Sequence, residues 1–576
     1  MPNQKSNSQS VVAFASPQEM SLKIRQKSQL KGRQADETSL QEVRALLLLD
    51  AEALKQRRDL LIEQLHALND SYRGLHERHL VALAKLMNIP MAEVYEVATF
   101  YHHFEVIREG EQAPHFTLRV CDGLSCEMAG AATLLNKLKA SLGTSEIKVV
   151  SAPCVGRCEQ APVAVVHQHE MGHASVEKVL AAVQAEAIHP VVPDYIDLNA
   201  YRADGGYALL QGLIGGTQNT EAVMKAMEDS GLRGLGGAGF PAGRKWRIVS
   251  EQAAPRLMAV NIDEGEPGTF KDRTYLERDP HRFLEGMLVA AHVVGIDAIY
   301  IYLRDEYHAC RQVLEAEVQK LKTNSAIHLP MIELRRGAGA YICGEESAMI
   351  ESIEGKRGEP RMRPPYIAQV GLFGRPTLEH NFETLYWVRD IVQKGPDWFS
   401  GFGRHGRKGL RSFSVSGRVK KPGVKLAPAG ITMAELIEEY CGGMQDGHKF
   451  YAYLPGGASG GILPASLSDI PLDFDTLQAY GCFIGSAAVI VLGHQDSARN
   501  AALNMMNFFA HESCGQCTPC RVGTEKAVQL MQAAVWDNAT LDDLNQVMTD
   551  ASICGLGQAA PNPVRCVQKY FPQEVA

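Results

Sequence analysis

Two groups of cysteines in the 576-residue chain have the spacing of metal ligands. In the first group, Cys121 pairs with Cys126 and Cys154 with Cys158, and each pair closely follows a predicted strand. Four thiolates suit zinc and iron–sulfur clusters about equally well. Because zinc ribbons usually have two-residue gaps in both pairs, the wider gaps here favour a [2Fe–2S] cluster. Structural zinc and uncoordinated buried thiols are the alternatives.

The second group lies near the C-terminus, where Cys514, Cys517 and Cys520 are separated by two-residue gaps. Such a triplet can bind three irons of a cubane, so the fourth ligand must come from elsewhere. The candidates are Cys554 and Cys566, and we expect Cys554 because the following Gly-Leu-Gly turn provides a mobile backbone. The sequence therefore predicts a [4Fe–4S] cluster, with zinc as the alternative. The thiols of the remaining cysteines, Cys310, Cys343, Cys441, Cys482 and Cys566, are expected to be buried and structural.

Three glycine-rich loops lie within about 115 residues of one another. Residues 231–243 hold six glycines, which can present several N–H groups to a phosphate, and Lys245 can add a cation. A second loop, residues 261–272, follows an apolar strand, the position at which α/β folds place ligands. Its Asn and Asp side chains could hydrogen-bond a flavin ring. Residues 337–346 repeat the mixture of glycine, aromatic and carboxylate residues. Because no loop has the usual dinucleotide fingerprint in its usual context, we expect a Rossmann-like variant.

The elements that must position these residues suggest an α/β multidomain chain. Hydrophobic periodicity predicts helices before residue 115 and after 496, alternating strands and helices around the first cysteine group, and short strands with Gly/Pro turns near 411–492. The predicted organisation is a disordered tail at 1–35, a helical bundle at 36–115, a thioredoxin-like ferredoxin domain at 116–190, an α/β domain at 200–408, a β-grasp module at 409–495 and a C-terminal helical bundle with the second cysteine group at 496–576.

Composition and charge favour a soluble protein. The net charge of −8 gives no indication of nucleic-acid binding. No apolar run reaches the roughly 18 residues of a membrane span, and the first 20 residues lack the pattern of a secretory signal. We therefore expect a cytoplasmic protein that has no membrane contact of its own. Clustered thiols in such a chain are more often metal ligands than disulfides.

Together, residues 231–246, 261–273, 337–346 and 512–521 resemble the NADH-binding flavoprotein subunit of respiratory complex I. The domain with the first cysteine group resembles the small [2Fe–2S] subunit of complex I, here fused ahead of the flavoprotein. From about residue 40, the chain most resembles the β subunits of molybdenum- or tungsten-dependent, NAD-dependent formate dehydrogenases. The diaphorase subunit of NAD-reducing hydrogenases is the near alternative.

The resemblance implies that residues 200–408 bind FMN and NADH. It implies FMN contacts from Gly234, Gly236, Lys245, Asn261, Asp263, Gly344, Glu345, Asn381 and Thr384, with Gly237 in the same cofactor-binding set. It implies dinucleotide contacts from Phe240, Glu266, Glu346, Arg363 and Tyr366. The sequence departs from the family pattern in four ways. Leu235 replaces an arginine, His380 replaces the first asparagine of a pair, and Arg363-Pro-Pro-Tyr366 replaces Lys-Pro-Pro-Phe. The spacer before the last cysteine is also shorter than in complex I.

NAD accepts a hydride, whereas iron–sulfur clusters pass one electron at a time, so a flavin that can do both belongs between them. We therefore expect a diaphorase that exchanges electrons with a partner carrying a molybdenum- or tungsten-pterin site, and no catalytic acid or base from this chain. A structural scaffold, in which the clusters only stabilise assembly, is the hypothesis from another class. It predicts no NADH oxidation with an artificial dye.

Overall fold

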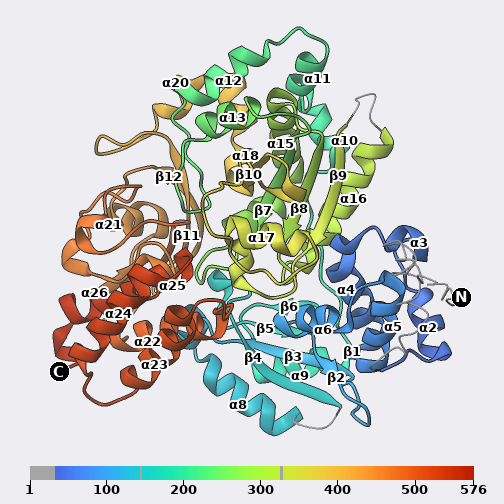
Figure 1. Cartoon of the computed structure of the whole chain (residues 1–576). Coiled ribbons are helices and arrows are strands. Elements are labelled where there is room, and N and C mark those ends of the chain that lie inside the picture. Colours follow the sequence, from blue (N-terminus) through green and yellow to red (C-terminus); the bar gives the residue numbers. More distant parts are fainter. Residues whose placement is uncertain (1–32, 143–145, 325–328) are drawn as a thin grey trace, which may run out of the picture.

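The computed structural model describes residues 33–142, 146–324 and 329–576 (Figure 1). The chain has the expected mixed α/β multidomain architecture. Figure 1 shows a thioredoxin-like sheet low in the molecule, with N-terminal helices on one side and C-terminal helices on the other, and a parallel sheet above it. Most of the tail predicted at 1–35 lies outside the described residues.

The central sheet is parallel throughout and has the strand order β10-β7-β8-β9. Its strands are β7 (Leu257–Ile262), β8 (Ala298–Leu303), β9 (Met331–Arg336) and β10 (Thr377–Asn381). Every residue of β8 is buried, as expected for a parallel strand covered on both faces. Met258 and Ile299 pack into a core with helix α15 (Pro280–Val294), whereas Ala259 and Tyr300 pack into a core with helix α17 (Glu346–Ile353).

The carboxyl ends of this sheet position the candidate cofactor loops. Strands β7 and β10 are neighbours in register, and Asn261 lies opposite Asn381. Asn381 ends β10 and Asn261 is the penultimate residue of β7, so both lie at the carboxyl edge of the sheet. Open α/β sheets bind ligands at this edge. The glycine-rich first loop ends at helix α13 (Ala242–Ser250), which packs beside the sheet against helix α12 (Thr220–Asp229) and α15.

The thioredoxin-like sheet carries the first cysteine group. Its order is β4-β3-β5-β6, in which β3 and β4 are parallel and the other neighbours antiparallel. The strands are β3 (Phe116–Cys121), β4 (Ile147–Ala152), β5 (Ala164–Val166) and β6 (His169–Met171), and the flanking helices are α8 (Ala131–Leu142) and α9 (Val176–Gln184). Cys121 ends β3 and Cys154 closely follows β4, so both cysteine pairs lie at one end of this sheet.

A five-stranded mixed sheet follows in the chain, as expected for a β-grasp module. Its order is β12-β11-β15-β13-β14, and its central pair, β11 and β15, is parallel. The strands are β11 (Leu410–Gly417), β12 (Gly423–Pro428), β13 (Phe450–Leu454), β14 (Leu463–Pro464) and β15 (Ala488–Gly493). The other neighbouring strands are antiparallel.

Helices complete the two ends of the described chain. The N-terminal group comprises α2 (Glu37–Arg44), α3 (Ala51–Leu54), α4 (Leu61–Tyr72), α5 (Glu77–Met87) and α6 (Met91–Phe100). The C-terminal group comprises α22 (Ala498–Glu512), α23 (Thr518–Met531), α24 (Asn538–Ala551), α25 (Gly555–Ala559) and α26 (Pro561–Tyr570). Across the described residues, none of the helices has both the length and the apolar character needed to span a bilayer.

Candidate cofactor sites

The three glycine-rich loops meet around one cavity of about 490 Å³. The first loop contributes Gly236 and Gly237, the second contributes the segment from Asp263 to Glu266, and the third contributes the segment from Tyr341 to Glu345. Asn261 and Asn381 line the cavity from the carboxyl ends of their strands. Of the residues predicted to bind cofactor, the structure therefore brings Gly236, Gly237, Asn261, Asp263, Glu266, Gly344, Glu345 and Asn381 to one place.

The polar groups of this cavity fit a ligand with hydrogen-bonding edges. Asn261 donates from Nδ2 to the main-chain oxygen of Gly344 at 2.9 Å, and its Oδ1 accepts from the N–H of Asp263 at 3.0 Å. Asp263 Oδ2 is buried and has no hydrogen-bond partner among the residues that the structure describes. Burial raises the pKa of Asp263 well above its usual value. A ligand that donates a hydrogen bond to this oxygen would remove the cost of leaving a polar atom unsatisfied.

The glycines leave room for a ligand to approach the main chain. Gly237 has a φ of +128°, which is outside the regions that other residues readily adopt. At Gly236, a Cβ atom would lie 3.0 Å from Cβ of Asn381, closer than ordinary van der Waals contact. Larger side chains at these positions would narrow the cavity. The wall therefore fits the planar ring system and phosphate of FMN.

A buried lysine that sequence reasoning did not select also lines this cavity. Lys271 is 1% exposed, and its ammonium group lies 2.7 Å from Asp272 and 3.1 Å from Glu383. Asp272 also accepts from Nδ2 of Asn381 at 2.7 Å, so the lysine fixes the group that orients Asn381. Lys271 and Asp272 end the second loop, and the signal that could have identified Lys271 was this adjacent Lys-Asp pair.

Glu266 forms the centre of a hydrogen-bond network at the cavity wall. Its carboxylate accepts from the N–H of Ser459 at 2.8 Å, from Ser459 Oγ at 2.5 Å and from the hydroxyl of Tyr341. Burial raises the pKa of Glu266. Sequence reasoning missed Tyr341 and Ser459 as lining residues. Ser459 lies in the β-grasp module, so this module closes one side of the cavity.

A second charged cluster lies outside the cavity wall. Lys245 forms a 3.0 Å ion pair with Glu379, and Arg363 lies 2.9 Å from Glu346 and contacts Glu345. Burial, followed by the neighbouring Glu379, raises the pKa of Glu346. The cluster combines cations and carboxylates, groups that can hold the phosphates and ribose hydroxyls of a dinucleotide.

Two aromatic residues predicted to contact the dinucleotide are exposed. Phe240 is 39% and Tyr366 57% exposed, so both rings are accessible for stacking.

Gly234 and Thr384 have local roles: the Gly234 N–H donates to the Phe240 oxygen at 2.8 Å, and Thr384 Oγ1 accepts from the N–H of Leu235 at 2.9 Å. Neither Gly234 nor Thr384 lines the cavity.

The structure explains one departure from the family pattern. His380 is buried, and its Nε2 accepts from the indole N–H of Trp246 at 2.7 Å. The imidazole therefore belongs to the packing between β10 and α13, whereas the next residue, Asn381, lines the cavity.

The four thiols of the first cysteine group lie together and are buried. Cys154 Sγ lies 3.2 Å from Cys158 Sγ. Contact with the thiols of Cys126 and Cys154 raises the pKa of Cys121 well above its usual value. The structure thus joins all four in a compact group of soft ligands, as a [2Fe–2S] cluster requires.

The second cysteine group also converges. Burial, together with the nearby Cys517 and Cys514, raises the pKa of Cys520 to about 11. Burial and the nearby Cys514 raise the pKa of Cys554 to about 12. Gly555 and Leu556, which follow Cys554, line the cavity described above. By contrast, Cys566 lies 3.4 Å from Cys482 in a separate buried pair.

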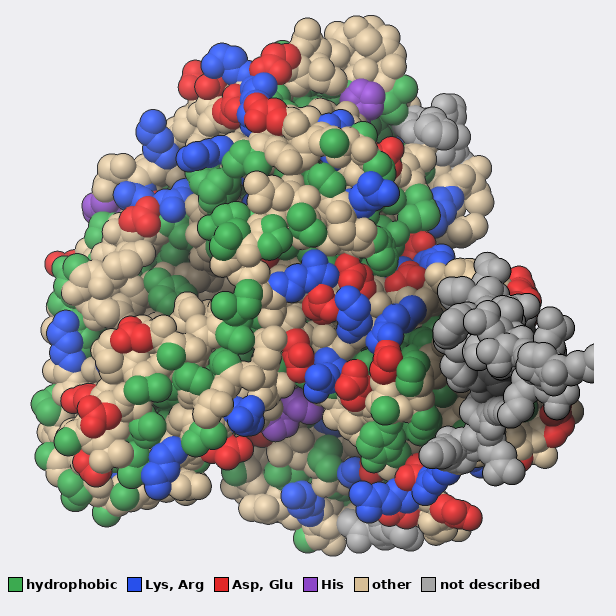
Figure 2. Space-filling view, in the orientation of Figure 1, with side chains coloured by type: hydrophobic (Ala, Val, Ile, Leu, Met, Phe, Trp, Pro, Cys, Tyr) green, Lys and Arg blue, Asp and Glu red, His purple; other side chains and the backbone are tan. Residues whose placement is uncertain are grey.

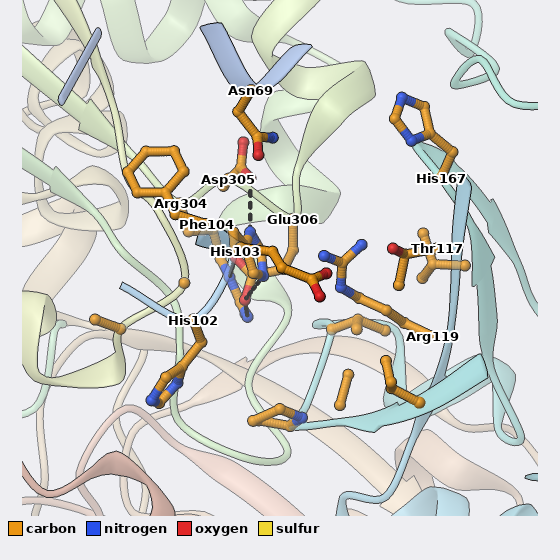
Figure 3. A pocket seen from close by; sticks show the side chains of 18 of the residues that line it. Asn69, His102, His103, Phe104, Thr117, Arg119, His167, Arg304, Asp305 and Glu306 are labelled. Atoms are coloured by element: carbon orange, nitrogen blue, oxygen red, sulfur yellow. Dashed lines mark hydrogen bonds and ion pairs between the residues drawn. The ribbon is translucent and has the colours of Figure 1, made fainter. Parts of the chain in front are cut away.

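A further cavity of about 540 Å³ lies where the thioredoxin-like domain meets the central sheet (Figure 3). Arg119 enters it from β3, and Arg304 and Glu306 enter it from the loop after β8. His103 forms a 2.6 Å contact with Asp305. Cys154, Asp263 and Tyr341 also line this cavity, which therefore borders both the first cysteine group and the glycine-loop cavity.

Four family models match the chain. They are the Nuo51 FMN-binding domain at residues 227–390, the NADH-ubiquinone oxidoreductase-F iron-sulfur binding region at 500–576, the thioredoxin-like [2Fe-2S] ferredoxin at 50–186 and the SLBB domain at 412–463. The [2Fe-2S] match includes much of the N-terminal helical region. The chain thus carries binding domains for FMN, NAD, a [2Fe–2S] cluster and a [4Fe–4S] cluster.

Curated relatives and solved structures agree with these matches. An F-type subunit (number 2) of the NADH-quinone oxidoreductase of Rhizobium meliloti is 40% identical over 398 residues, which cover 66% of this chain and 94% of that protein. The mitochondrial NADH dehydrogenase [ubiquinone] flavoprotein 1 of Dictyostelium discoideum is 39% identical over 372 residues, covering 61% and 78%. A chain of the H2-reduced NAD+-reducing [NiFe]-hydrogenase superposes with a TM-score of 0.80 at 32% identity, covering 90% of this chain and 93% of that one. The chain is an NAD(H)-dependent oxidoreductase of the diaphorase type, and it belongs to the family of the F-type flavoprotein subunits of NADH-quinone oxidoreductase.

Proposed function

We propose that the chain is the diaphorase subunit of an NAD-dependent formate dehydrogenase complex. It would connect NAD(H) to the metal centres of a partner subunit that carries a molybdenum- or tungsten-pterin site. The observation that carries the diaphorase role is the cavity formed by three glycine-rich loops, which Gly555 and Leu556 of the second cysteine group also line. The neighbouring cavity, which shares Asp263 and Tyr341 with it, is lined by Cys154 of the first group. When bound there, FMN supplies the conversion between a hydride and single electrons.

The chain's own residues position these groups in this proposal. Asn261, Asp263 and Asn381 would hydrogen-bond the flavin, because all three line the cavity at the carboxyl ends of β7 and β10. The main chain of the first loop would approach the flavin and its phosphate at Gly236 and Gly237, and Gly234 would hold the loop in shape through its hydrogen bond to Phe240. Gly344 and Glu345 would complete the opposite wall, and Thr384 would support the first loop through its contact with Leu235.

The dinucleotide would lie between the exposed Phe240 and Tyr366 and the charged cluster. Glu266 and Glu346 would orient it through hydrogen bonds to its ribose and amide groups, and Arg363 would contact a phosphate. Lys245 would bind the FMN phosphate. Its ammonium group would then either contact both the phosphate and Glu379 or break its ion pair with Glu379. No side chain is assigned as a general acid or base, since the chain's contribution is positioning and electrostatics.

The thiols of Cys121, Cys126, Cys154 and Cys158 would hold the [2Fe–2S] cluster. Those of Cys514, Cys517, Cys520 and Cys554 would hold the [4Fe–4S] cluster. The domain boundaries given from the sequence remain part of this proposal. The proposal also includes a cytoplasmic location, which rests on the sequence features alone.

The identity of the electron donor is the finer part of the proposal. Resemblance to formate dehydrogenase β subunits, from about residue 40 onward, supports formate. A second candidate is the diaphorase of an NAD-reducing hydrogenase, and the agreement with such a hydrogenase over 90% of this chain favours it. Both candidates assign the same cofactors to this chain and differ only in the partner.

Two measurements test the proposal at its two levels. The cofactor-loaded chain alone should reduce ferricyanide with NADH, and NADH should bleach its flavin absorption. A protein that holds flavin and iron but does neither would favour the scaffold hypothesis. The complex purified from its native source through an affinity tag on this chain should contain molybdenum or tungsten and oxidise formate. Nickel and hydrogen oxidation instead would establish the hydrogenase alternative.

A further inference from the structure

Two histidines and a glutamate from distant parts of the chain converge at the rim of the cavity in Figure 3. His102 follows helix α6 near the N-terminus, whereas His511 and Glu512 end helix α22. One ligand atom from each of the three side chains lies within 4.8 Å of the other two. Figure 2 shows histidine side chains at the lower middle of its face.

Glu512 is held so that one carboxylate oxygen is directed at the histidines. Its Oε2 accepts from the N–H of Tyr341 at 2.9 Å. Its Oε1 lies 3.1 Å from Nδ1 of His511 and 3.8 Å from Nδ1 of His102. The Glu512 side chain is only 4% exposed, whereas the imidazoles of His102 and His511 are 39% and 48% exposed. An ion arriving from solvent could therefore reach a carboxylate that is already fixed in place.

The spacing matches a tetrahedral zinc site. Zinc bonds of about 2.0–2.1 Å to nitrogen and oxygen place neighbouring ligand atoms about 3.3 Å apart. The separations of 3.1 and 3.8 Å from Glu512 Oε1 lie on either side of this value. Two imidazoles and one carboxylate also form a ligand set that suits zinc and its neighbours, whereas magnesium and calcium prefer oxygen ligands.

We propose that His102, His511 and Glu512 bind a divalent transition-metal ion of the zinc type, with water in the fourth position. The site is distinct from both cysteine groups, because none of its ligands is a thiol. The ion would join the segment after α6 to the end of α22. Through the bond between Glu512 and Tyr341, it would also fix a residue that lines the glycine-loop cavity.

Zinc binding to the cofactor-loaded protein tests this site directly. After dialysis against EDTA, the protein is equilibrated with micromolar zinc, and bound zinc, iron and flavin are measured by elemental analysis and absorption. The wild type should bind about one zinc per chain more than the His102→Ala and His511→Ala variants. Its iron and flavin contents should not change, which excludes replacement of the clusters. Millimolar magnesium should not displace the zinc.

A matched control is His405→Ala. His405 is also an exposed histidine beside a glutamate, with Nε2 3.2 Å from Glu435, and neither residue belongs to the proposed site. This variant should retain the wild-type zinc content. The proposal would be overturned if the wild type and His102→Ala bound the same amount of zinc and reached half-saturation at the same zinc concentration.

Hydrogen exchange supplies a second measurement that does not depend on counting ions. Zinc should slow exchange of the main-chain amides in residues 101–105 of the wild type, because the ion ties this segment to α22. The His102→Gln variant retains a polar side chain at this position, and zinc should not change the exchange of its main-chain amides. Slowing of the same size in His102→Gln would also contradict the proposed ligand set.

Discussion

The guanidinium of Arg304 donates a 2.7 Å hydrogen bond to the main-chain oxygen of Cys154. The same group donates to the main-chain oxygen of Glu264 in the second glycine-rich loop. Arg304 is 4% exposed, and Glu306 balances its charge at 2.8 Å. One buried cation therefore connects the first cysteine group to the wall of the proposed flavin cavity. The two domains that it joins resemble two separate subunits of complex I.

Replacing Arg304 should loosen this junction. Arg304→Met removes both main-chain hydrogen bonds and leaves the Glu306 carboxylate buried without its partner, which should cost about 3–5 kcal/mol in the free energy of unfolding. Urea unfolding followed by circular dichroism measures the loss. The double variant Arg304→Met/Glu306→Gln should recover part of it, because it removes the unpaired charge. A single variant as stable as the wild type would show that the junction does not depend on this cation.

The fourth ligand of the [4Fe–4S] cluster should be identified by two cysteine substitutions. Cys554→Ser should lower the iron content of the chain by up to about four atoms and remove the signal of the reduced cubane from the paramagnetic resonance spectrum. Cys566→Ser is the matched control, because Cys566 is also a cysteine near the C-terminus but is buried and pairs with Cys482. Loss of the cubane signal in Cys566→Ser alone would reverse the assignment.

Lys245 should contribute to FMN retention. Loss of a charge-assisted hydrogen bond to the phosphate, worth about 1.5–3 kcal/mol, should raise the Kd for FMN of Lys245→Ala about tenfold or more. Fluorescence titration of the deflavinated protein with FMN measures this change. Arg247→Ala is the control, because Arg247 lies on the same helix but pairs with the exposed Glu221 and with Glu228. Wild-type FMN affinity in Lys245→Ala would exclude a phosphate contact.

Much of this organisation could be predicted from the sequence because its signals are local. Cysteine spacing, strands that run into cysteines, and glycine-rich turns after apolar strands each depend on a few neighbouring residues. The expected thioredoxin-like, Rossmann-like and β-grasp layers are all present. The Gly-Leu-Gly turn after Cys554 also favoured Cys554 over Cys566 as the partner of the triplet, and in the structure Cys566 pairs with Cys482 instead.

Contacts between distant segments could not be predicted in the same way. Ser459 reaches Glu266 across 193 positions, and Arg304 reaches Cys154 across 150. Such contacts depend on how whole domains pack, and neither Ser459 nor Arg304 belongs to a sequence motif that would indicate its partner. His102 is a single histidine in a helical region, and only the fold brings it beside Glu512.

Acid should destabilise the protein through His66, which lies on α4 and donates from Nε2 to the main-chain oxygen of Gly337 at 2.8 Å. Burial, followed by the nearby Arg336, lowers its pKa to about 3. The unfolded chain takes up a proton near pH 6.5 that the folded chain excludes, so stability is present above pH 6.5 and is lost as the pH falls toward 3. At pH 5.5 this single group should cost about 1.4 kcal/mol relative to pH 7.5. His66→Gln keeps a hydrogen-bond donor but cannot titrate. Urea unfolding should therefore show that its free energy of unfolding falls by about 1.4 kcal/mol less than that of the wild type between pH 7.5 and pH 5.5. Equal losses in the wild type and His66→Gln would show that His66 is not buried in its neutral form.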